Sequence, residues 1–483
     1  MLVSIILNIE VGMDFINRAD EMNRLLQVVK RESPALVVLW GRRRLGKSRL
    51  LTEWCQQVNG TYWVADESGP AIQRRYLAEE LGAVFPGFAD VSYPDWTALL
   101  NRLSSEARQI NWRGPLVLDE FPYLVSGAPE LPSVLQKWVD RENRAGGIVL
   151  ALSGSSQRMM LDSVLNASAP LYGRADECFK IEPLSPGYIG QAISISNPQS
   201  LLDFYTCWGG VARYWELAQP FHDRYRDALD ERVLSPLGVL HDEVNRLLRE
   251  EMPSAMPLRP IMDAIGLGAH RTSEIAARLQ TPVTSLSRSL TQLQQLGYIR
   301  REIPYGENEK NSKKALYGLS DPFLRLWFTV VAPHRGILQT ASKSVRVKWL
   351  DRNWGLLRAK AWEDLCRMAL PHLGLFQREW QSAGRYWAGN QSEWDVVCRS
   401  LDDDMLILGE CKSLARPATK MDIEKTIRTL LAKTVPDSIA TQSRQYEYVI
   451  FVPSLDQTPK SLPGNIHVVD GQRIFNTLVS HPE

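Results

Sequence analysis

Apolar residues in the first 180 positions fall into short runs that alternate with segments of helical periodicity. The runs lie at 35–40, 115–118, 147–152 and 178–181. Between them, apolar residues recur at three- and four-residue spacing, which is typical of helices that bury one face. Strands that alternate with helices in this way form parallel sheets covered on both sides. Residues 15–183 are therefore predicted to form an α/β domain.

The pattern changes after this region. Residues 184–254 are helical in periodicity with few β-branched runs, which indicates a small helical lid. Residues 255–330 predict three helices and a hairpin: an apolar stripe at 272–279, a second helix opened by Pro282, then two short strands with a polar tip. The order helix, turn, helix, wing is typical of a winged helix.

A second α/β pattern ends the chain. After a helical connector at 331–354, residues 355–483 predict a helix, three strands, an amphipathic helix and a further strand. Residues 1–14 are interpreted as a leader, too short to cross a membrane. A length of 483 residues exceeds what one hydrophobic core supports, so several domains are expected.

The composition mainly argues against certain classes of site and partner. The chain is 44% apolar and 23% charged with a formal net charge of +1, so any nucleic-acid surface must be local. The six cysteines form no C-x-x-C pair, which indicates neither a zinc site nor a disulfide framework. No run approaches 18 apolar residues, so no membrane partner is expected, and a cytoplasmic location fits best.

The clearest motif follows the first apolar run. It matches G-x-x-x-x-G-K-[ST] and leads directly into a helical pattern, which is the context this motif requires. The glycines let backbone N–H groups turn toward phosphates, the lysine reaches the β and γ oxygens, and the serine can hold Mg²⁺. ATP and Mg²⁺ are the predicted cofactors. The motif consists of Gly41, Arg42, Arg43, Arg44, Leu45, Gly46, Lys47 and Ser48.

Two carboxylates end a later strand. Asp119 is expected to hold Mg²⁺ through water, and Glu120 to orient or deprotonate the attacking water, which favours hydrolysis over binding alone. After the next strand, a hydroxyl of Ser155 or Ser156 could sense the γ-phosphate, or the segment is a simple turn. Arg174 could act as an arginine finger, in cis or from a neighbouring subunit of a homo-oligomer, or form a surface salt bridge.

Basic residues gather in the predicted winged helix. On an otherwise neutral chain they would make a local basic surface, which favours DNA binding. The alternative is a winged helix that packs against protein only. The residues are Arg288, Arg300, Arg301, Lys310, Lys313 and Lys314.

The last domain carries a set of acidic residues with a lysine. Asp395 lies in one predicted strand, and the next ends in Glu410-Cys-Lys412, where strand alternation places Glu410 and Lys412 on one face. Carboxylates there can bind Mg²⁺ or Mn²⁺ while the ammonium stabilises an attacking hydroxide or developing phosphorane charge. Glu363, on the preceding helix, could be a third metal ligand.

The N-terminal motifs resemble those of archaeal-type AAA+ ATPases, which are related to STAND-type P-loop NTPases. The resemblance covers most of residues 15–182 and implies an ATP-hydrolysing module. It continues into later segments, with Ala212 where the family usually has proline. It rests on Phe15-Ile-Asn-Arg18 with Glu21, the Gly41 loop, Asp119-Glu-Phe-Pro-Tyr-Leu124, Gly154-Ser-Ser156, Pro170-Leu-Tyr-Gly-Arg174, Gly209-Gly-Val211, and Tyr317-Gly-Leu-Ser-Asp321-Pro-Phe-Leu324 with Trp327.

Residues 355–453 resemble the PD-(D/E)xK restriction-endonuclease-like fold, which often ends ATPases of this kind. The resemblance implies that Glu363, Asp395, Glu410 and Lys412 occupy its metal and catalytic positions, although the motif's proline is missing before Asp395. The leading hypothesis is an AAA+-like module that controls a C-terminal metal-dependent nuclease. The alternatives are an ATP-switched DNA-binding or regulatory protein with an inert nuclease fold, and an interaction hub whose winged helix packs against protein.

Overall fold

The protein is described by a computed structural model in which contacts divide the chain into two compact units. One unit is Arg18–Pro183, and the other combines Met1–Asn17 with Leu184–Glu483. The described residues are 13–143, 147–155, 157–251, 258–308, 312, 314–440, 445–457 and 462–480. None of the helices in these ranges is both long and apolar enough to cross a membrane.

The first unit contains a five-stranded sheet in which every pairing is parallel, in the order β2-β3-β4-β1-β5. The predicted α/β class and parallel sheet are thereby confirmed. Strand β2 was not among the predicted strands. The strands are β1 (Ala35–Trp40), β2 (Thr61–Val64), β3 (Leu116–Asp119), β4 (Val149–Gly154) and β5 (Glu177–Lys180).

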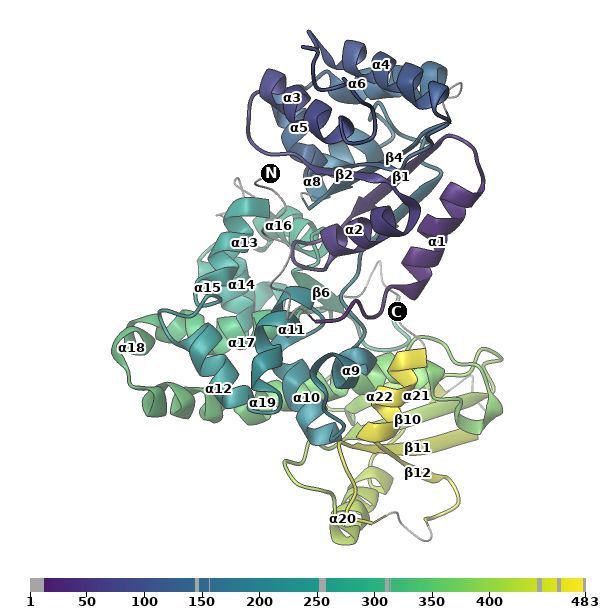
Figure 1. The fold of residues 1–483 in the computed structure, drawn as a ribbon. Coiled ribbons are helices and arrows are strands. Elements are labelled where there is room, and N and C mark those ends of the chain that lie inside the picture. Colours follow the sequence, from purple (N-terminus) through teal and green to yellow (C-terminus); the bar gives the residue numbers. More distant parts are fainter. Residues whose placement is uncertain are drawn as a thin grey trace. The chain divides into compact units, whose positions relative to one another are not determined.

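Helices lie on both faces of this sheet (Figure 1). On one face, alternate strand residues such as Leu36, Leu118 and Leu150 form a buried core with Leu77 of α3 and Leu99 of α4. Period-two alternation explains why every second strand residue joins this core. The helices are α1 (Ala19–Lys30), α2 (Lys47–Val58), α3 (Pro70–Leu81), α4 (Trp96–Gln109), α5 (Phe121–Gly127), α6 (Leu131–Lys137) and α8 (Gln157–Met160).

The second unit begins with helices and continues through a segment we call α14–β7. In that segment three helices precede a two-stranded antiparallel sheet, and Leu286, Leu290 and Leu293 form a buried stripe on the third helix. The first helices are α9 (Ile189–Ile193), α10 (Pro198–Trp208), α11 (Ala212–Ala218), α12 (Tyr225–Leu229) and α13 (Glu243–Glu251). The α14–β7 segment comprises α14 (Arg259–Gly266), α15 (Thr272–Leu279), α16 (Val283–Gln295), β6 (Ile299–Glu302) and β7 (Leu316–Leu319).

A mixed sheet ends the chain, in the order β12-β11-β10-β9-β8. Strand β9 is antiparallel to both neighbours, whereas β10, β11 and β12 are parallel. The 27-residue helix α19 (Lys343–Ala369) precedes it, after α17 (Pro322–Leu326) and α18 (Arg335–Thr340). The other elements are β8 (Gly384–Tyr386), β9 (Trp394–Arg399), β10 (Met405–Cys411), α20 (Lys420–Leu431), α21 (Asp437–Ala440), β11 (Gln445–Val452), β12 (Ile466–Asp470) and α22 (Gly471–Ser480).

Candidate functional sites

The predicted phosphate-binding loop connects the end of β1 to the start of α2. Gly41 has φ +152°, and a Cβ added there would lie 2.6 Å from the carbonyl oxygen of Ile181, so no side chain fits. Gly46 caps α2 in the left-handed region, with φ 92°. Both glycines are thus required by the path of the backbone, which turns sharply into a helix N-terminus.

Two basic side chains brace the loop from within. Lys47 is buried, and its ammonium donates to the carbonyl oxygens of Gly41 (2.8 Å) and Arg42 (3.0 Å). Arg18, also buried, donates to the carbonyl oxygen of Leu45 at 3.1 Å and pairs with Glu21 at 2.8 Å. The loop is therefore anchored at both ends by buried cations.

Ser48 and Asp119, each expected to hold Mg²⁺, contact each other. Oδ2 of Asp119, which is 1% exposed, accepts hydrogen bonds from Ser48 Oγ and from the phenol of Tyr62, both at 2.7 Å. Burial and the Asp119 charge raise the pKa of Tyr62, so the phenol stays a donor. Sequence reasoning missed Tyr62, because only the pairing of β2 with β3 brings it to this carboxylate.

Glu120 stands at the junction of β3 and α5 with φ 52°. Its carboxylate accepts from the hydroxyl of Ser155 at the end of neighbouring β4, at 2.9 Å to each oxygen. The hydroxyl predicted to sense the γ-phosphate therefore contacts the carboxylate predicted to orient water. The alternative residue, Ser156, lies outside the described residues.

Arg174 forms an ion pair within its own unit. Its guanidinium donates to both carboxylate oxygens of Asp140 at 3.0–3.1 Å, and to the carbonyl oxygen of Pro170 at 3.1 Å. A surface salt bridge was the alternative to an arginine finger in the sequence analysis of Arg174, and this ion pair corresponds to that alternative. An arginine-finger role would require Arg174 to leave Asp140.

The C-terminal acidic residues lie on adjacent antiparallel strands. Gly409 of β10 pairs with Val396 of β9, so Asp395 and Glu410 are the next opposing pair. Oδ2 of Asp395 accepts from the backbone N–H of Cys411 at 2.9 Å. Burial, followed by the charge of Glu410, raises the pKa of Asp395 to about 6, with a smaller contribution from Glu363. The charges of Glu410 and Glu363 therefore both act on Asp395.

Two lysines neutralise Glu410. Lys412 donates to Oε1 at 2.7 Å, and Lys433, just beyond the end of α20, donates to Oε2. Burial acts to raise the pKa of Glu410, but these two hydrogen bonds hold it below its ordinary value. Lys433 also donates to the carbonyl oxygen of Glu393 at 2.7 Å. No motif in the sequence points to Lys433, which follows Glu410 by 23 residues.

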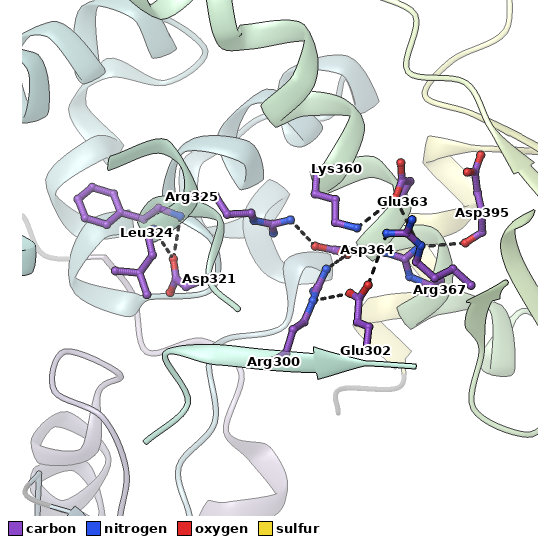
Figure 2. A network of polar contacts seen from close by, with 12 residues as sticks. Arg300, Glu302, Asp321, Leu324, Arg325, Lys360, Glu363, Asp364, Arg367 and Asp395 are labelled. Atoms are coloured by element: carbon purple, nitrogen blue, oxygen red, sulfur yellow. Dashed lines mark hydrogen bonds and ion pairs between the residues drawn. The ribbon is translucent and has the colours of Figure 1, made fainter. Parts of the chain in front are cut away.

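Glu363 lies on α19, near but not beside this pair. Its carboxylate contacts Lys360 at 3.3 Å and Arg367 at 3.5 Å, and Arg367 donates to the carbonyl oxygen of Asp395 at 2.9 Å (Figure 2). Within the described residues, no three His, Cys, Asp or Glu side chains stand close enough to hold a metal together. Asp395 and Glu410 nevertheless suit Mg²⁺, which commonly takes one or two carboxylates and completes its shell with water and phosphate.

Fewer basic side chains of the α14–β7 segment are available to form a basic surface than the sequence predicted. Arg288 is exposed on α16, but Arg300 contacts Glu302 and Asp364, both at 2.7 Å. Arg301 donates to the carbonyl oxygen of Ser312, and Lys314 pairs with Glu307. Arg300 therefore does not contribute to that surface as predicted, because its guanidinium pairs with acidic residues inside its own unit. Lys310 and Lys313 lie outside the described residues.

Comparisons with known proteins support the interpretation of the nucleotide site. Residues 15–211 match a family model described as an ATPase domain predominantly from Archaea, and residues 327–423 match one of archaeal and bacterial proteins of unknown function. The uncharacterised protein MJECL04 of Methanocaldococcus jannaschii is 26% identical over 424 residues, covering 87% of this chain and 92% of the relative. Neither family description assigns a nuclease or a winged helix.

Similar solved structures show the fold alone. The Walker-type ATPase PABY2304 of Pyrococcus abyssi has a TM-score of 0.50 and 17% identity, over 65% of this chain and 96% of that one. The ORC2 protein of Aeropyrum pernix has a TM-score of 0.44 and 13% identity, over 73% and 97%. A likeness as low as the second carries no argument about function. The family match and the parallel sheet together support a P-loop ATPase domain.

Proposed function

We propose that this chain is an ATPase whose nucleotide site governs a metal-dependent nuclease acting on DNA. The ATPase part is supported by the family match, by the contact of Lys47 with the Gly41 carbonyl oxygen, and by the contact of Ser48 with Asp119. The observation that carries the nuclease part is the opposing pair Asp395 and Glu410, with Lys412 at hydrogen-bond distance from Glu410. Carboxylates on neighbouring strands beside an ammonium suit phosphodiester hydrolysis.

The nucleotide site supplies binding, orientation and a base. Backbone N–H groups of the loop and the N-terminus of α2 attract phosphates, and Lys47 exchanges its two loop carbonyls for phosphate oxygens. Ser48 and Asp119 are the residues that would hold Mg²⁺. Glu120 orients the attacking water, and the hydroxyl of Ser155 fixes the direction of its carboxylate.

The C-terminal site combines the carboxylates of Asp395 and Glu410 with the ammonium groups of two lysines. Asp395 and Glu410 would hold a divalent ion, which when bound provides Lewis-acid stabilisation of phosphate charge and a hydroxide nucleophile. With its pKa near 6, Asp395 is ionised at neutral pH and can serve as a ligand. Release of Glu410 from Lys412 and Lys433 leaves two ammonium groups to attract the DNA phosphate.

A cleavage assay tests the nuclease part. Pure protein is incubated with single- and double-stranded DNA, with and without Mg²⁺ and ATP, and the Asp395→Ala variant is run in parallel. Cleavage by the wild type alone supports the proposal. Equal survival of the DNA with both proteins in every condition would reject it.

One observation favours a second function. Both oxygens of Glu410 accept hydrogen bonds from lysines, so two ammonium groups compete with a metal ion for this carboxylate. Such a site suits an ATP-switched DNA-binding or regulatory protein with an inert nuclease-like domain. ATP turnover and DNA binding that persist without cleavage would select this alternative.

A further inference from the structure

A buried carboxylate joins three arginines from three separate elements of the second unit (Figure 2). Asp364 is 7% exposed and contacts Arg300 of β6 at 2.7 Å, Arg325 of α17 at 2.6 Å and Arg367 of its own helix at 2.7 Å. We call these four residues the Asp364 cluster. It ties the α14–β7 segment to α19 by charge pairs that water cannot readily screen.

Strand β6 presents two charges to this cluster. Arg300 and Glu302 are two residues apart, so strand alternation places them on one face. Glu302 pairs with Arg300 at 2.7 Å and with Arg385 of β8 at 3.6 Å. The face of β6 that carries Arg300 and Glu302 is therefore engaged with α19 and the C-terminal sheet.

Arg367 connects the Asp364 cluster to the acidic site, which we define as Glu363, Asp395 and Glu410. Its guanidinium contacts the Glu363 carboxylate at 3.5 Å and donates to the carbonyl oxygen of Asp395 at 2.9 Å. The other side of Asp395 is fixed by its hydrogen bond from Cys411. Arg367 thus sets the distance between α19, which carries Glu363, and β9, which carries Asp395.

We propose that Arg367 and Asp364 are positioning residues for the acidic site, and that Arg300 makes strand β6 part of the same support. This inference rests on the proposed metal-dependent function and assigns the α14–β7 segment a role in it. Partners of metal ligands hold their orientation, and their loss commonly lowers metal affinity by about 10- to 100-fold. A cluster with only a structural role would affect folding stability but not the metal affinity of the folded protein.

The test measures Mn²⁺ binding to the full chain without nucleotide, from the free-ion signal in electron paramagnetic resonance. Asp395→Asn reports whether the acidic site binds the ion. Arg367→Met and Arg300→Met should each weaken binding by about 10-fold or more, and Arg367→Lys should restore part of it. Arg301→Met is the matched control, since it removes the same side chain from the adjacent position of β6, outside the cluster.

A second measurement, amide hydrogen exchange, distinguishes local loosening of the acidic site from a general failure of a variant to fold. Amide hydrogen exchange at residues 394–411 should accelerate in Arg367→Met and stay unchanged in Arg301→Met. If Asp395→Asn loses Mn²⁺ while Arg367→Met and Arg300→Met bind it like the wild type, the positioning roles are refuted and the proposed function survives. If Asp395→Asn binds Mn²⁺ like the wild type, the metal is elsewhere, and both proposals fail.

Discussion

Replacing Asp364 by asparagine should loosen helix α19 far more than an equivalent change at its surface. The side chain is only 6% exposed and holds three guanidinium groups at 2.6–2.7 Å. Removing one partner of a buried charge pair typically costs about 3–5 kcal/mol, because the remaining charges stay buried without compensation. The asparagine oxygen retains one acceptor, so we expect about 3 kcal/mol, or roughly a 100-fold change in local opening.

Hydrogen exchange of peptides from α19 measures this opening. Asp351→Asn is the matched control on the same helix, because that side chain is 44% exposed and pairs with Arg226 at 3.0 Å. An exposed pair contributes about 0–1 kcal/mol, so exchange should change less than about fivefold. Equal exchange in the two variants would refute the reasoning that the Asp364 cluster stabilises α19.

The pH dependence of this effect has a definite sign. Although burial acts to raise it, the charges of Arg300, Arg325 and Arg367 hold the pKa of Asp364 well below its ordinary range. Its stabilising contribution is therefore fully present above the unfolded value of about 3.9 and is lost as the pH falls through the lower folded value. The difference between wild type and Asp364→Asn should stay constant from about pH 5 to 8 and shrink below about pH 4.

Three further predictions concern the other sites. Glu120→Gln should lower ATP turnover about 100-fold or more while nucleotide affinity, measured by calorimetry, stays within about twofold, because the loop is untouched. Gly41→Ala should abolish nucleotide binding in the same titration, because its Cβ would meet the Ile181 carbonyl oxygen at 2.6 Å. Arg288→Ala should reduce the salt slope of DNA binding by about 1, whereas Arg300→Ala should leave that slope unchanged, since Arg300 pairs with Asp364.

Local patterns were enough to predict the nucleotide-binding half. The run at 35–40 became β1 residue for residue, and the glycine-rich motif follows it directly, with Lys47 and Ser48 as the first residues of α2. A buried parallel strand is continuously apolar, and a phosphate-binding loop needs glycine at fixed positions. Both features can therefore be recognised in the sequence. The contact between Ser48 and Asp119 joins this motif to the acidic end of a later strand, and both residues were expected to hold Mg²⁺.

Partners far apart in the chain could not be predicted in this way. Arg300 looked like a DNA-contacting residue of a wing, but its partner Asp364 lies 64 residues later, on helix α19. Lys433 reaches Glu410 only because α20 ends beside β10, and Tyr62 reaches Asp119 only through strand pairing. Charged residues have no periodicity that reveals whether they face water or a buried partner of opposite charge.

The most direct test of the central claim is the rate of Mg²⁺-dependent DNA cleavage with and without ATP, for the wild type, Lys47→Ala and Asp395→Asn. Lys47 lies in the nucleotide loop, so its loss should remove the response to ATP without disturbing the C-terminal sheet. We predict that ATP changes wild-type cleavage about 10-fold or more, that Lys47→Ala cleaves at one rate in both conditions, and that Asp395→Asn does not cleave. Cleavage by Asp395→Asn at the wild-type rate, or an undiminished ATP response in Lys47→Ala, would contradict the account.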